Sequence, residues 1–458
     1  MGPGGRTAQR ALDLALCMSG DHRADVAIVG GGFVGLWTAY HLKKLEPQLR
    51  VVVLERGTCG SGASGINGGF LMSWWSKIAC LLRACGTEDA LWLAAQSTDA
   101  VSGLAPLLEQ YGVDAELVLK GWMWTATSRG QIGSWNGLLD TLDKLGHGHV
   151  FRELAADEVA RRSGSPVHLA GVFEAVNGTV HPARLVQGLT GIVSSMGVQI
   201  FDHTPVRSME RSRPVRLVCD RGSVYAERVV LASNAWAAAV PELARSFVCA
   251  TSSVVSTPPI PARLAEIGWT GGESITDSQS TVLYYRTTAD GRIVFGKGGG
   301  QLAFTGEPPT WVFDHADGIE AAAKEFRRVY PMLADVPIER GWSGPIDRSL
   351  DGLPMLGTLP RAPHIAYGIG WSGNGVGPSR VGGRILAGLA LEHADQWTQN
   401  GLIGRRLRTF PPEPLRFVGG RLLRAALARA DQADILGRPT SAVDRAVLRL
   451  APRGFETS

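Results

Sequence analysis

One stretch near the N-terminus limits the possible fold more than any other part of the chain. Residues 25–30 (DVAIVG) are almost all apolar, which is the pattern of a parallel strand buried on both faces. A glycine-rich turn follows at 30–35 (GGGFVG), then helically spaced apolar residues over 36–45, and then a second buried strand at 50–54 (RVVVL). This order predicts a β-α-β unit within a parallel sheet.

The glycine spacing of this turn is the one that binds the pyrophosphate of a dinucleotide. Gly30 permits the tight turn, Gly32 lets the backbone approach the pyrophosphate, and Gly35 lets the helix pack closely against the strand. The N-terminus of the helix offers N–H groups and the positive end of its dipole to the phosphates. Glu55 stands 20 residues after Gly35, where an acidic side chain accepts hydrogen bonds from a ribose 2′-hydroxyl. We therefore predict a dinucleotide-binding site here.

Composition supports a large globular protein. With 458 residues, 45% of them hydrophobic and 19% charged, the chain can build a sizeable core, which excludes disorder for the bulk of it. The length favours two interwoven domains. The 46 basic and 42 acidic residues leave a net charge of +4, which is too balanced to indicate nucleic-acid binding. The 58 glycines are in excess, as in proteins whose backbone packs closely against a cofactor.

Four further segments favour FAD over NAD as that cofactor. Residues 60–70 (GSGASGINGGF) form a second stretch rich in glycine and serine, and residues 226–236 (AERVVLASNAW) predict a late buried strand with a small-residue turn. Residues 342–357 contain an Asp-Gly turn and two prolines. Residues 364–389 predict a strand, a glycine-dense turn at 368–377 and an apolar helix. The N-terminus of that helix suits the partly negative O2 edge of a reduced flavin, for which an NAD-only enzyme has no evident use.

With these motifs in place, the chain resembles the FAD-dependent amine and amino-acid oxidoreductases of the D-amino-acid oxidase, glycine oxidase and sarcosine oxidase superfamily. The resemblance covers about residues 20–440. It looks closest to the gamma-glutamylputrescine oxidase-like and aminophosphonate oxidoreductase branch, in which segments similar to 63–69, 277–300, 342–357 and 368–379 recur. Ile66 departs from that branch, which commonly carries Arg in this position.

The resemblance implies an α/β fold in which an antiparallel-sheet α+β substrate domain is inserted into a Rossmann-like FAD-binding domain with a central parallel sheet. We expect the discontinuous FAD-binding domain at 25–105, 167–250 and 336–400, and the substrate domain at 106–166 and 251–335. Residues 1–24 then form an N-terminal extension, and residues 401–458 form a basic helical tail.

The motifs and the resemblance together assign a set of cofactor-binding residues. These are Gly30, Gly32, Phe33, Gly35, Glu55, Arg56, Gly62, Ala63, Ser64, Asn67, Gly68, Gly69, Val206, Ala232, Ser233, Asn234, Trp236, Gly344, Gly370, Ser372, Gly373, Asn374, Gly375 and Val376. We expect the FAD to be non-covalent. Sarcosine-oxidase-like relatives attach flavin to a Cys near the last glycine-rich motif, but no cysteine follows Cys249, and residues 57–70 contain no His for a histidyl bond.

The candidates for chemistry cluster in a predicted β-hairpin at 278–300, which the resemblance places over the flavin. Strand alternation puts Tyr284 and Arg286 on one face and Tyr285 on the other, so one set should face a cavity. Lys297 stands just past the hairpin, where a cation near flavin N5 would help oxygen accept an electron. The predicted catalytic residues are Lys297, Tyr284, Tyr285 and Trp371, and the predicted substrate-binding residues are Arg286, Arg348, Trp74 and Trp75. Core packing of the aromatic residues and a surface position for Lys297 remain alternatives.

The activity that the resemblance implies is oxidation of a C–N bond in an amine, an amino acid or an aminophosphonate. Hydride transfer to flavin N5 would give an imine, which hydrolyses to an aldehyde or keto acid, and O2 would reoxidise the flavin. An apolar, aromatic pocket keeps the amine neutral because it penalises the ammonium form. Two alternatives stay open. The protein is an amine dehydrogenase or a flavoprotein subunit that passes electrons to a quinone or a partner protein, or it is a biosynthetic tailoring oxidase that acts on a larger substrate.

The charge of the C-terminal tail and the spacing of the cysteines give expectations about binding partners and cellular location. Residues 401–458 hold eleven arginines against five acids, and such a basic helix can bind a membrane surface or an acidic partner. Its apolar spacing is imperfect, which favours a helix packed on the same chain with solvated arginines. No apolar run approaches the ~18 residues of a membrane span. The six cysteines form no C-x-x-C pair and no metal-spaced cluster, so we expect no metal site and reduced thiols in a cytoplasmic protein.

Overall fold

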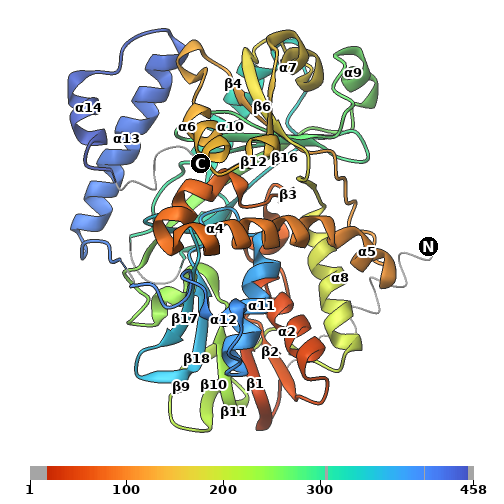
Figure 1. Ribbon diagram of the computed structural model, residues 1–458, viewed down its shortest axis with the longest axis vertical. Helices are drawn as coiled ribbons and strands as arrows, with labels where there is room; N and C mark the ends of the chain where they lie inside the picture. Colours follow the sequence, from red (N-terminus) through yellow and green to blue (C-terminus); the bar gives the residue numbers. More distant parts are fainter. Residues whose placement is uncertain (1–17, 305–307, 407, 452–458) are drawn as a thin grey trace.

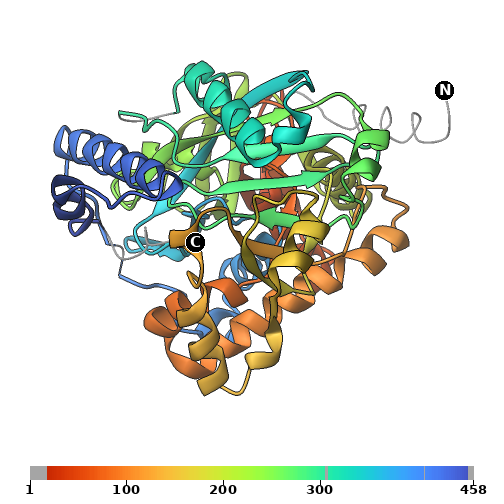
Figure 2. The same cartoon turned by 90° about the horizontal axis from the view of Figure 1, so that it is seen from above.

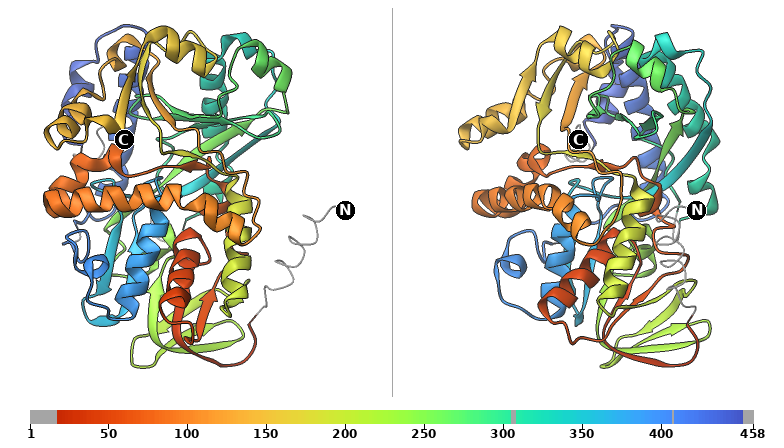
Figure 3. Two further views of the ribbon diagram at one scale, coloured as in Figure 1. Left: turned by 45° about the vertical axis from the view of Figure 1, so that its right-hand side comes forward. Right: turned by 90° about the vertical axis from the view of Figure 1, so that its right-hand side faces the viewer.

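The computed structural model describes residues 18–304, 308–406 and 408–451. It has two large sheets, one in the lower and one in the upper part of Figure 1, with the long helix α4 (Ile78–Ser102) crossing between them. The same division is visible from the two further directions of Figure 3. Of the predicted N-terminal extension, residues 1–17 lie outside the described residues, and β1 already begins at His22.

The first sheet has a parallel centre, which confirms the α/β prediction. Its parallel strands run β18, β11, β1, β2 and β8, and β17, β10 and β9 add antiparallel pairs at its side. Their bounds are β1 (His22–Val29), β2 (Val51–Leu54), β8 (Gln199–Phe201), β9 (Val206–Glu210), β10 (Val215–Cys219), β11 (Gly222–Leu231), β17 (Met355–Leu359) and β18 (Ala362–Ile369).

Strand β1 is buried on both faces, as its sequence predicts. Val26 and Ile28 pack into a core cluster with α2 (Phe33–Leu45) and α11 (Pro378–Ala390), whereas Ala27 packs into a second cluster on the opposite face. This division follows from the alternation of side chains along a strand. Burial on both faces explains why the segment carries no polar residue after Asp25.

The turn between β1 and α2 depends on two glycines. Gly30 has a φ of 113°, and a Cβ there would lie 2.5 Å from the Ala232 carbonyl oxygen. At Gly35 a Cβ would lie 2.0 Å from the carbonyl oxygen of Gly30. The helix therefore approaches the strand more closely than any side chain allows, which is the reason that the sequence motif needs glycine at these positions.

The second sheet is antiparallel except for the parallel pair of β13 and β4, and this confirms the expected sheet type. Its order is β16-β12-β15-β14-β13-β4-β6-β5. The bounds are β4 (Trp122–Ala126), β5 (Phe151–Leu154), β6 (Ala170–Glu174), β12 (Phe247–Ser256), β13 (Ser274–Thr276), β14 (Leu283–Thr287), β15 (Ile293–Lys297) and β16 (Arg340–Ser349). The predicted hairpin is present as β14–β15, with Gly291 at a φ of 80° in its turn.

Helices cover these sheets and one helical pair lies at the side. In Figure 2, α13 and α14 (blue) lie at one edge of the molecule. The remaining elements are α3 (Ala63–Ile66), α5 (Leu104–Gln110), α6 (Asn136–Lys144), α7 (Ala156–Ser163), α8 (Pro182–Ser195), α9 (Pro261–Glu266), α10 (Ala316–Val329), α12 (Gln396–Gln399), α13 (Leu415–Ile435), α14 (Ala442–Leu448), β3 (Phe70–Leu71), β7 (Gly178–Thr179), η1 (Trp75–Lys77), η2 (Arg129–Gln131), η3 (Gly148–Val150), η4 (Asn234–Ala239), η5 (Thr310–Phe313) and η6 (Pro331–Leu333). Among the described helices, none has the length and apolar character to cross a bilayer.

The close approach at Gly35 can be tested by adding one methyl group. We expect Gly35→Ala to lower the free energy of unfolding by at least about 2 kcal/mol, because the backbone oxygen of Gly30 cannot move aside without shifting β1. Gly191→Ala in α8 is the matched control, since a Cβ there meets no atom within 4 Å and helix propensity predicts a gain of about 0.5–1 kcal/mol. Chemical denaturation of both variants decides the point. If Gly35→Ala were as stable as the unsubstituted protein, α2 would accommodate the extra methyl group and the prediction would be wrong.

Candidate active site between the two sheets

A cavity of about 610 Å³ is lined by residues from both sheets. Phe33 at the start of α2 and Asn234 at the start of η4 contribute from helices that follow strands of the first sheet, and Tyr284 and Arg348 contribute from strands of the second. Most of the lining is apolar or aromatic. The cavity therefore lies where the dinucleotide-type turns meet the antiparallel sheet.

The acid after β2 is bound to the glycine turn itself. The Glu55 carboxylate accepts hydrogen bonds from the N–H groups of Gly31 and Gly57, both at 2.8 Å. Burial raises the pKa of Glu55, and these N–H groups partly offset the effect. Gly32 has no side chain to cap α2, so the helix begins with its N–H groups directed at the turn. Backbone N–H donors and a carboxylate acceptor thus stand together, which is the combination that binds the pyrophosphate and ribose of a dinucleotide.

The segment from 62 to 69 packs over the start of α2. The Phe33 N–H donates to Ser64 Oγ at 2.9 Å, and the Asn67 amide bridges the carbonyls of Ala63 and Ser64 and the N–H of Gly69. Ile66 accepts from Trp342 Nε1 through its carbonyl oxygen. A Cβ at Gly344 would lie 3.0 Å from the Ile66 side chain, so the two residues meet at the cavity wall.

A buried carboxylate holds the second glycine-rich turn. Asp347 in β16 accepts hydrogen bonds from the N–H groups of Gly370 (2.6 Å) and Trp371 (3.0 Å). Burial raises the pKa of Asp347 to about 7 against the opposing effect of these donors. Ser372 (φ 54°) and Asn234 (φ 49°) adopt left-handed backbone conformations at the cavity. Such backbone strain in non-glycine residues is concentrated at functional sites.

The structure brings many of the predicted residues to this cavity and leaves others beside it. Those that line it are Phe33, Ala63, Ser64, Asn67, Gly68, Asn234, Tyr284, Gly344, Arg348, Trp371, Ser372, Gly373, Asn374, Gly375 and Val376. Those outside its lining are Gly30, Gly32, Gly35, Glu55, Arg56, Gly62, Gly69, Trp74, Trp75, Val206, Ala232, Ser233, Trp236, Tyr285, Arg286, Lys297 and Gly370. Arg56 and Trp236 of the second group contact each other, with the guanidinium 4.4 Å from the ring centroid.

The alternation along β14 separates the two tyrosines. Tyr284 lines the cavity, lies across Gly296 of β15 and hydrogen-bonds Ser252 Oγ at 2.7 Å. Tyr285 is fully buried on the other face, where its hydroxyl meets His168 Nε2 at 2.6 Å. We therefore no longer propose Tyr285 as a catalytic residue, because a substrate in the cavity cannot reach it.

Arg286 shares the face of Tyr284 but is engaged by the backbone. Its Nε donates to the Gly68 carbonyl at 2.7 Å and its Nη2 to the Val180 carbonyl at 3.0 Å. Burial lowers the pKa of Arg286 to about 10. The predicted substrate contact is replaced by a structural role: the side chain ties the 62–69 segment to the second sheet.

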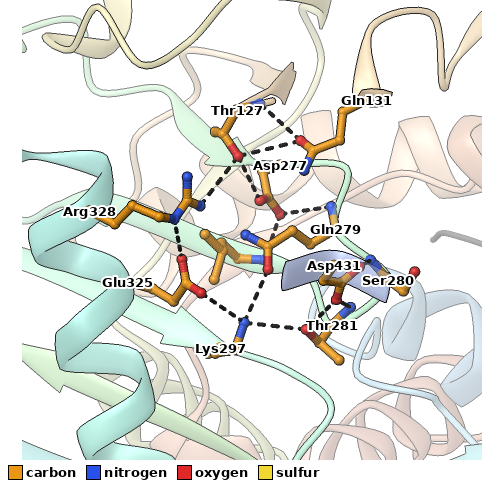
Figure 4. A network of polar contacts seen from close by, with 11 residues as sticks. Thr127, Gln131, Asp277, Gln279, Ser280, Thr281, Lys297, Glu325, Arg328 and Asp431 are labelled. Atoms are coloured by element: carbon orange, nitrogen blue, oxygen red, sulfur yellow. Dashed lines mark hydrogen bonds and ion pairs between the residues drawn. The ribbon is translucent and has the colours of Figure 1, made fainter. Parts of the chain in front are cut away.

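Lys297 belongs to a polar network (Figure 4), and the register of β14 and β15 places its side chain on the face of the second sheet opposite Tyr284. Its Nζ lies 3.2 Å from Gln279 Oε1, 3.2 Å from Thr281 Oγ1 and 3.5 Å from Glu325 Oε1. Burial opposes ionisation of Glu325, but the charges of Lys297 and Arg328 lower its pKa overall. The prediction that Lys297 is catalytic is therefore corrected, because strand alternation turns its side chain towards α10 and away from the cavity.

Of the tryptophans predicted to lie at the site, one lines the cavity and two do not. Trp74 and Trp75 pack in the core against α4, where Ser97 Oγ accepts the Trp74 N–H and Thr98 Oγ1 accepts Trp75 Nε1–H. They therefore do not wall the cavity as predicted. Trp371 does line it, although its indole packs against Gly382 of α11.

Sequence reasoning missed a second cation of the cavity, Lys77. It ends η1 two residues after Trp75 and lines the cavity near Arg348. Burial, with a further contribution from the Arg348 charge, lowers the pKa of Lys77 to about 8. Burial lowers the pKa of Arg348 to about 10. The one signal in the sequence that could have indicated Lys77 is that it follows Trp74 and Trp75, which stand close to the glycine-rich 60–70 segment.

Comparison with known proteins agrees with the expected family. The sequence model of a family described as "FAD dependent oxidoreductase" matches residues 25–389. A probable oxidoreductase, OrdL, of Haemophilus influenzae is 28% identical over 375 residues, which are 80% of this chain and 82% of that protein. Gamma-glutamylputrescine oxidoreductase of Escherichia coli is 28% identical over 405 residues, which are 87% of this chain and 89% of that protein.

A solved structure extends the agreement to the fold. The crystal structure of glycine oxidase from Geobacillus kaustophilus superimposes with a TM-score of 0.67 at 24% identity, over 82% of this chain and 96% of that one. At this identity the match shows the fold alone.

The division of the two tyrosines gives a paired test. We expect Tyr284→Phe to change turnover or KM without lowering thermal stability much, because Tyr284 lines the cavity and Ser252 Oγ keeps the Lys297 carbonyl as a partner. Tyr285→Phe leaves the buried His168 ring nitrogen without its partner, so it should cost about 1–3 kcal/mol of stability and leave KM unchanged. Thermal denaturation and steady-state kinetics of both variants distinguish the roles. The reverse pattern would contradict the assignment of the two faces.

Proposed function

The chain belongs to the FAD-dependent oxidoreductase family, and from this premise we propose that it oxidises a C–N bond in an amine or amino acid. The observation that carries the proposal is the cavity in which glycine-rich turns, Tyr284 and two half-buried cations meet. Relatives named gamma-glutamylputrescine oxidoreductase, glycine oxidase and sarcosine oxidase subunit beta support an amine or amino-acid substrate.

The residues present fit FAD as the resident cofactor. The turn at 30–35 with Glu55 would hold the ribose and pyrophosphate, and the turn at 370–376 would stand beside the flavin ring. When bound, FAD supplies the two-electron chemistry of the reaction. We propose that it is held non-covalently, because no cysteine or histidine is among the described residues that line the cavity.

The cavity residues suit an amine that also carries an anionic group. The apolar lining disfavours the ammonium form and so keeps the amine neutral, with its lone pair available to form the C=N bond of the imine. Burial raises the pKa of Tyr284 to about 12, so its hydroxyl stays a neutral hydrogen-bond donor or acceptor. Lys77 and Arg348 supply positive charge, while both oxygens of Asp347 are bound to the 370–371 backbone. We infer that a carboxylate or phosphonate of the substrate meets this cationic pair, in the role first expected of Arg286 or Arg348.

The decisive experiment is an anaerobic titration of the purified protein with amines, amino acids and aminophosphonates. Loss of the visible flavin absorbance with one class, followed by rapid recovery and peroxide on admission of air, would support a C–N oxidase that uses O2. Slow recovery of the absorbance in air would indicate that the electron acceptor is a molecule other than O2. A protein that retains flavin but is bleached by no member of the panel would contradict the proposal. Release of the flavin by acid precipitation would support non-covalent binding.

Lys77 gives a pH-dependent prediction. Because its pKa is lowered to about 8, its charge is present below pH 8 and is lost as the pH rises through that value. The KM for an anionic amine should therefore increase above pH 8. Lys77→Met should raise KM about tenfold to a hundredfold at pH 7 and abolish this inflection.

Two comparisons control that result. Lys297→Met removes a lysine that points away from the cavity, so the pH profile of KM should remain that of the unsubstituted protein. An uncharged amine of similar size should be insensitive to Lys77→Met. An unchanged KM for the anionic amine in Lys77→Met would refute the role of Lys77.

A further inference from the structure

The helical pair α13–α14 exposes an unusual number of large apolar side chains. Of the nine such side chains exposed in the described part of the chain, six lie on these helices or within two residues of their ends: Leu415, Val418, Leu422, Leu436, Val443 and Leu450. The first three recur at the spacing of one helix face along α13. A seventh, Phe304, packs against Phe417 with ring centroids 5.2 Å apart. The pair therefore exposes several large apolar side chains to its surroundings.

The acids of this pair are turned inward. Asp431 accepts hydrogen bonds from the N–H groups of Ser280 (2.9 Å) and Thr281 (3.0 Å), and Asp434 accepts from Ser128. Asp431 thereby fixes α13 to the network of Figure 4. Asp444 joins α14 to α13 through Arg429 at 2.5 Å. Two acids of the pair thus attach it to the rest of the chain, and the third joins its two helices.

Most arginines of the pair are turned outward, whereas Arg416 and Arg424 donate to backbone carbonyls of the chain. Arg421, Arg438, Arg445 and Arg449 are exposed. Arg421 lies over the Phe417 ring at 5.5 Å, and Arg445 donates to the carbonyl of Thr440. The outer surface consequently combines apolar side chains with several positive charges and no exposed carboxylate from α13 or α14.

This surface borders the mouth of the cavity. Leu415, Leu422 and Leu450 are 65%, 59% and 84% exposed and also belong to the cavity lining. Inside the mouth, Arg424 of α13 donates to the Gly299 carbonyl at 2.8 Å. Whatever covers the helical pair therefore lies at the entrance of the site.

We propose that α13–α14 docks on the surface of an anionic lipid bilayer. Leucine and valine side chains enter the headgroup region while flanking arginines meet the lipid phosphates, which is how basic amphipathic helices lie at an interface. The contact is peripheral. A second copy of the same surface is disfavoured as the occupant, because it would bring arginines against arginines. In the docked state the cavity mouth faces the bilayer.

The test is flotation of the FAD-loaded full chain with vesicles. We expect binding to vesicles of phosphatidylglycerol and phosphatidylcholine, little binding to phosphatidylcholine alone, and weakening in high salt. Arg445→Gln combined with Arg449→Gln should lower the partition coefficient about thirtyfold. Val418→Gln combined with Val443→Gln should lower it by about tenfold or more.

Matched control variants distinguish binding through this surface from non-specific binding of the protein to vesicles. Lys44→Gln with Lys324→Gln removes two exposed charges elsewhere, and Leu119→Gln removes an exposed leucine elsewhere, so these variants should bind as the unsubstituted chain does. Flavin absorbance and thermal denaturation verify that each variant is folded. Absence of binding to the anionic vesicles, or equal loss in controls and tail variants, would overturn the proposal. So would a dimer in sedimentation velocity that the tail substitutions dissociate, since a second copy would then be the occupant.

Discussion

A single buried carboxylate links the two sheets at the point where the cavity forms. Asp347 belongs to the second sheet, yet its oxygens hold the N–H groups of Gly370 and Trp371 from the turn that ends the first sheet's β18. The donors oppose the effect of burial on its ionisation. Without this acceptor, the glycine-rich turn would leave buried N–H groups unpaired, at a cost that backbone hydrogen bonding normally prevents. The position of the turn, and hence of the cavity wall, depends on this contact.

The identity of the cavity-facing residues follows from which neighbour covers each face of the second sheet. Helix α10 covers the face that carries Tyr285 and Lys297, so these side chains join a core and a polar network. The opposite face remains available to Tyr284, because Gly296 leaves room for its ring. Arg286 shows that a correct face is not enough, since the carbonyls of Gly68 and Val180 bind its guanidinium before any substrate can.

The wall contributed by the C-terminal helices lies beyond the part of the chain that the family model matches. That match ends at residue 389, whereas α13 begins at Leu415 and lines the cavity with Gly419, Gly420 and Leu423. The core of the fold and the two sheets are therefore shared with the family. Part of the cavity wall is instead formed by a segment with its own charge pattern.

The sequence by itself determined the features that depend on local geometry. Glycine spacing at 30–35 defines the turn because only glycine tolerates a φ of 113° and the approach of Gly35 to Gly30. The apolar run of β1 predicts burial on both faces, and the Asp290-Gly291 turn predicts the β14–β15 hairpin. Tertiary structure alone decided that Tyr284 rather than Tyr285 lines the cavity, that Lys77 rather than Lys297 does, and that the tail's acids point inward. Each of these depends on which distant element packs on a given face, and that information is absent from the periodicity of any one segment.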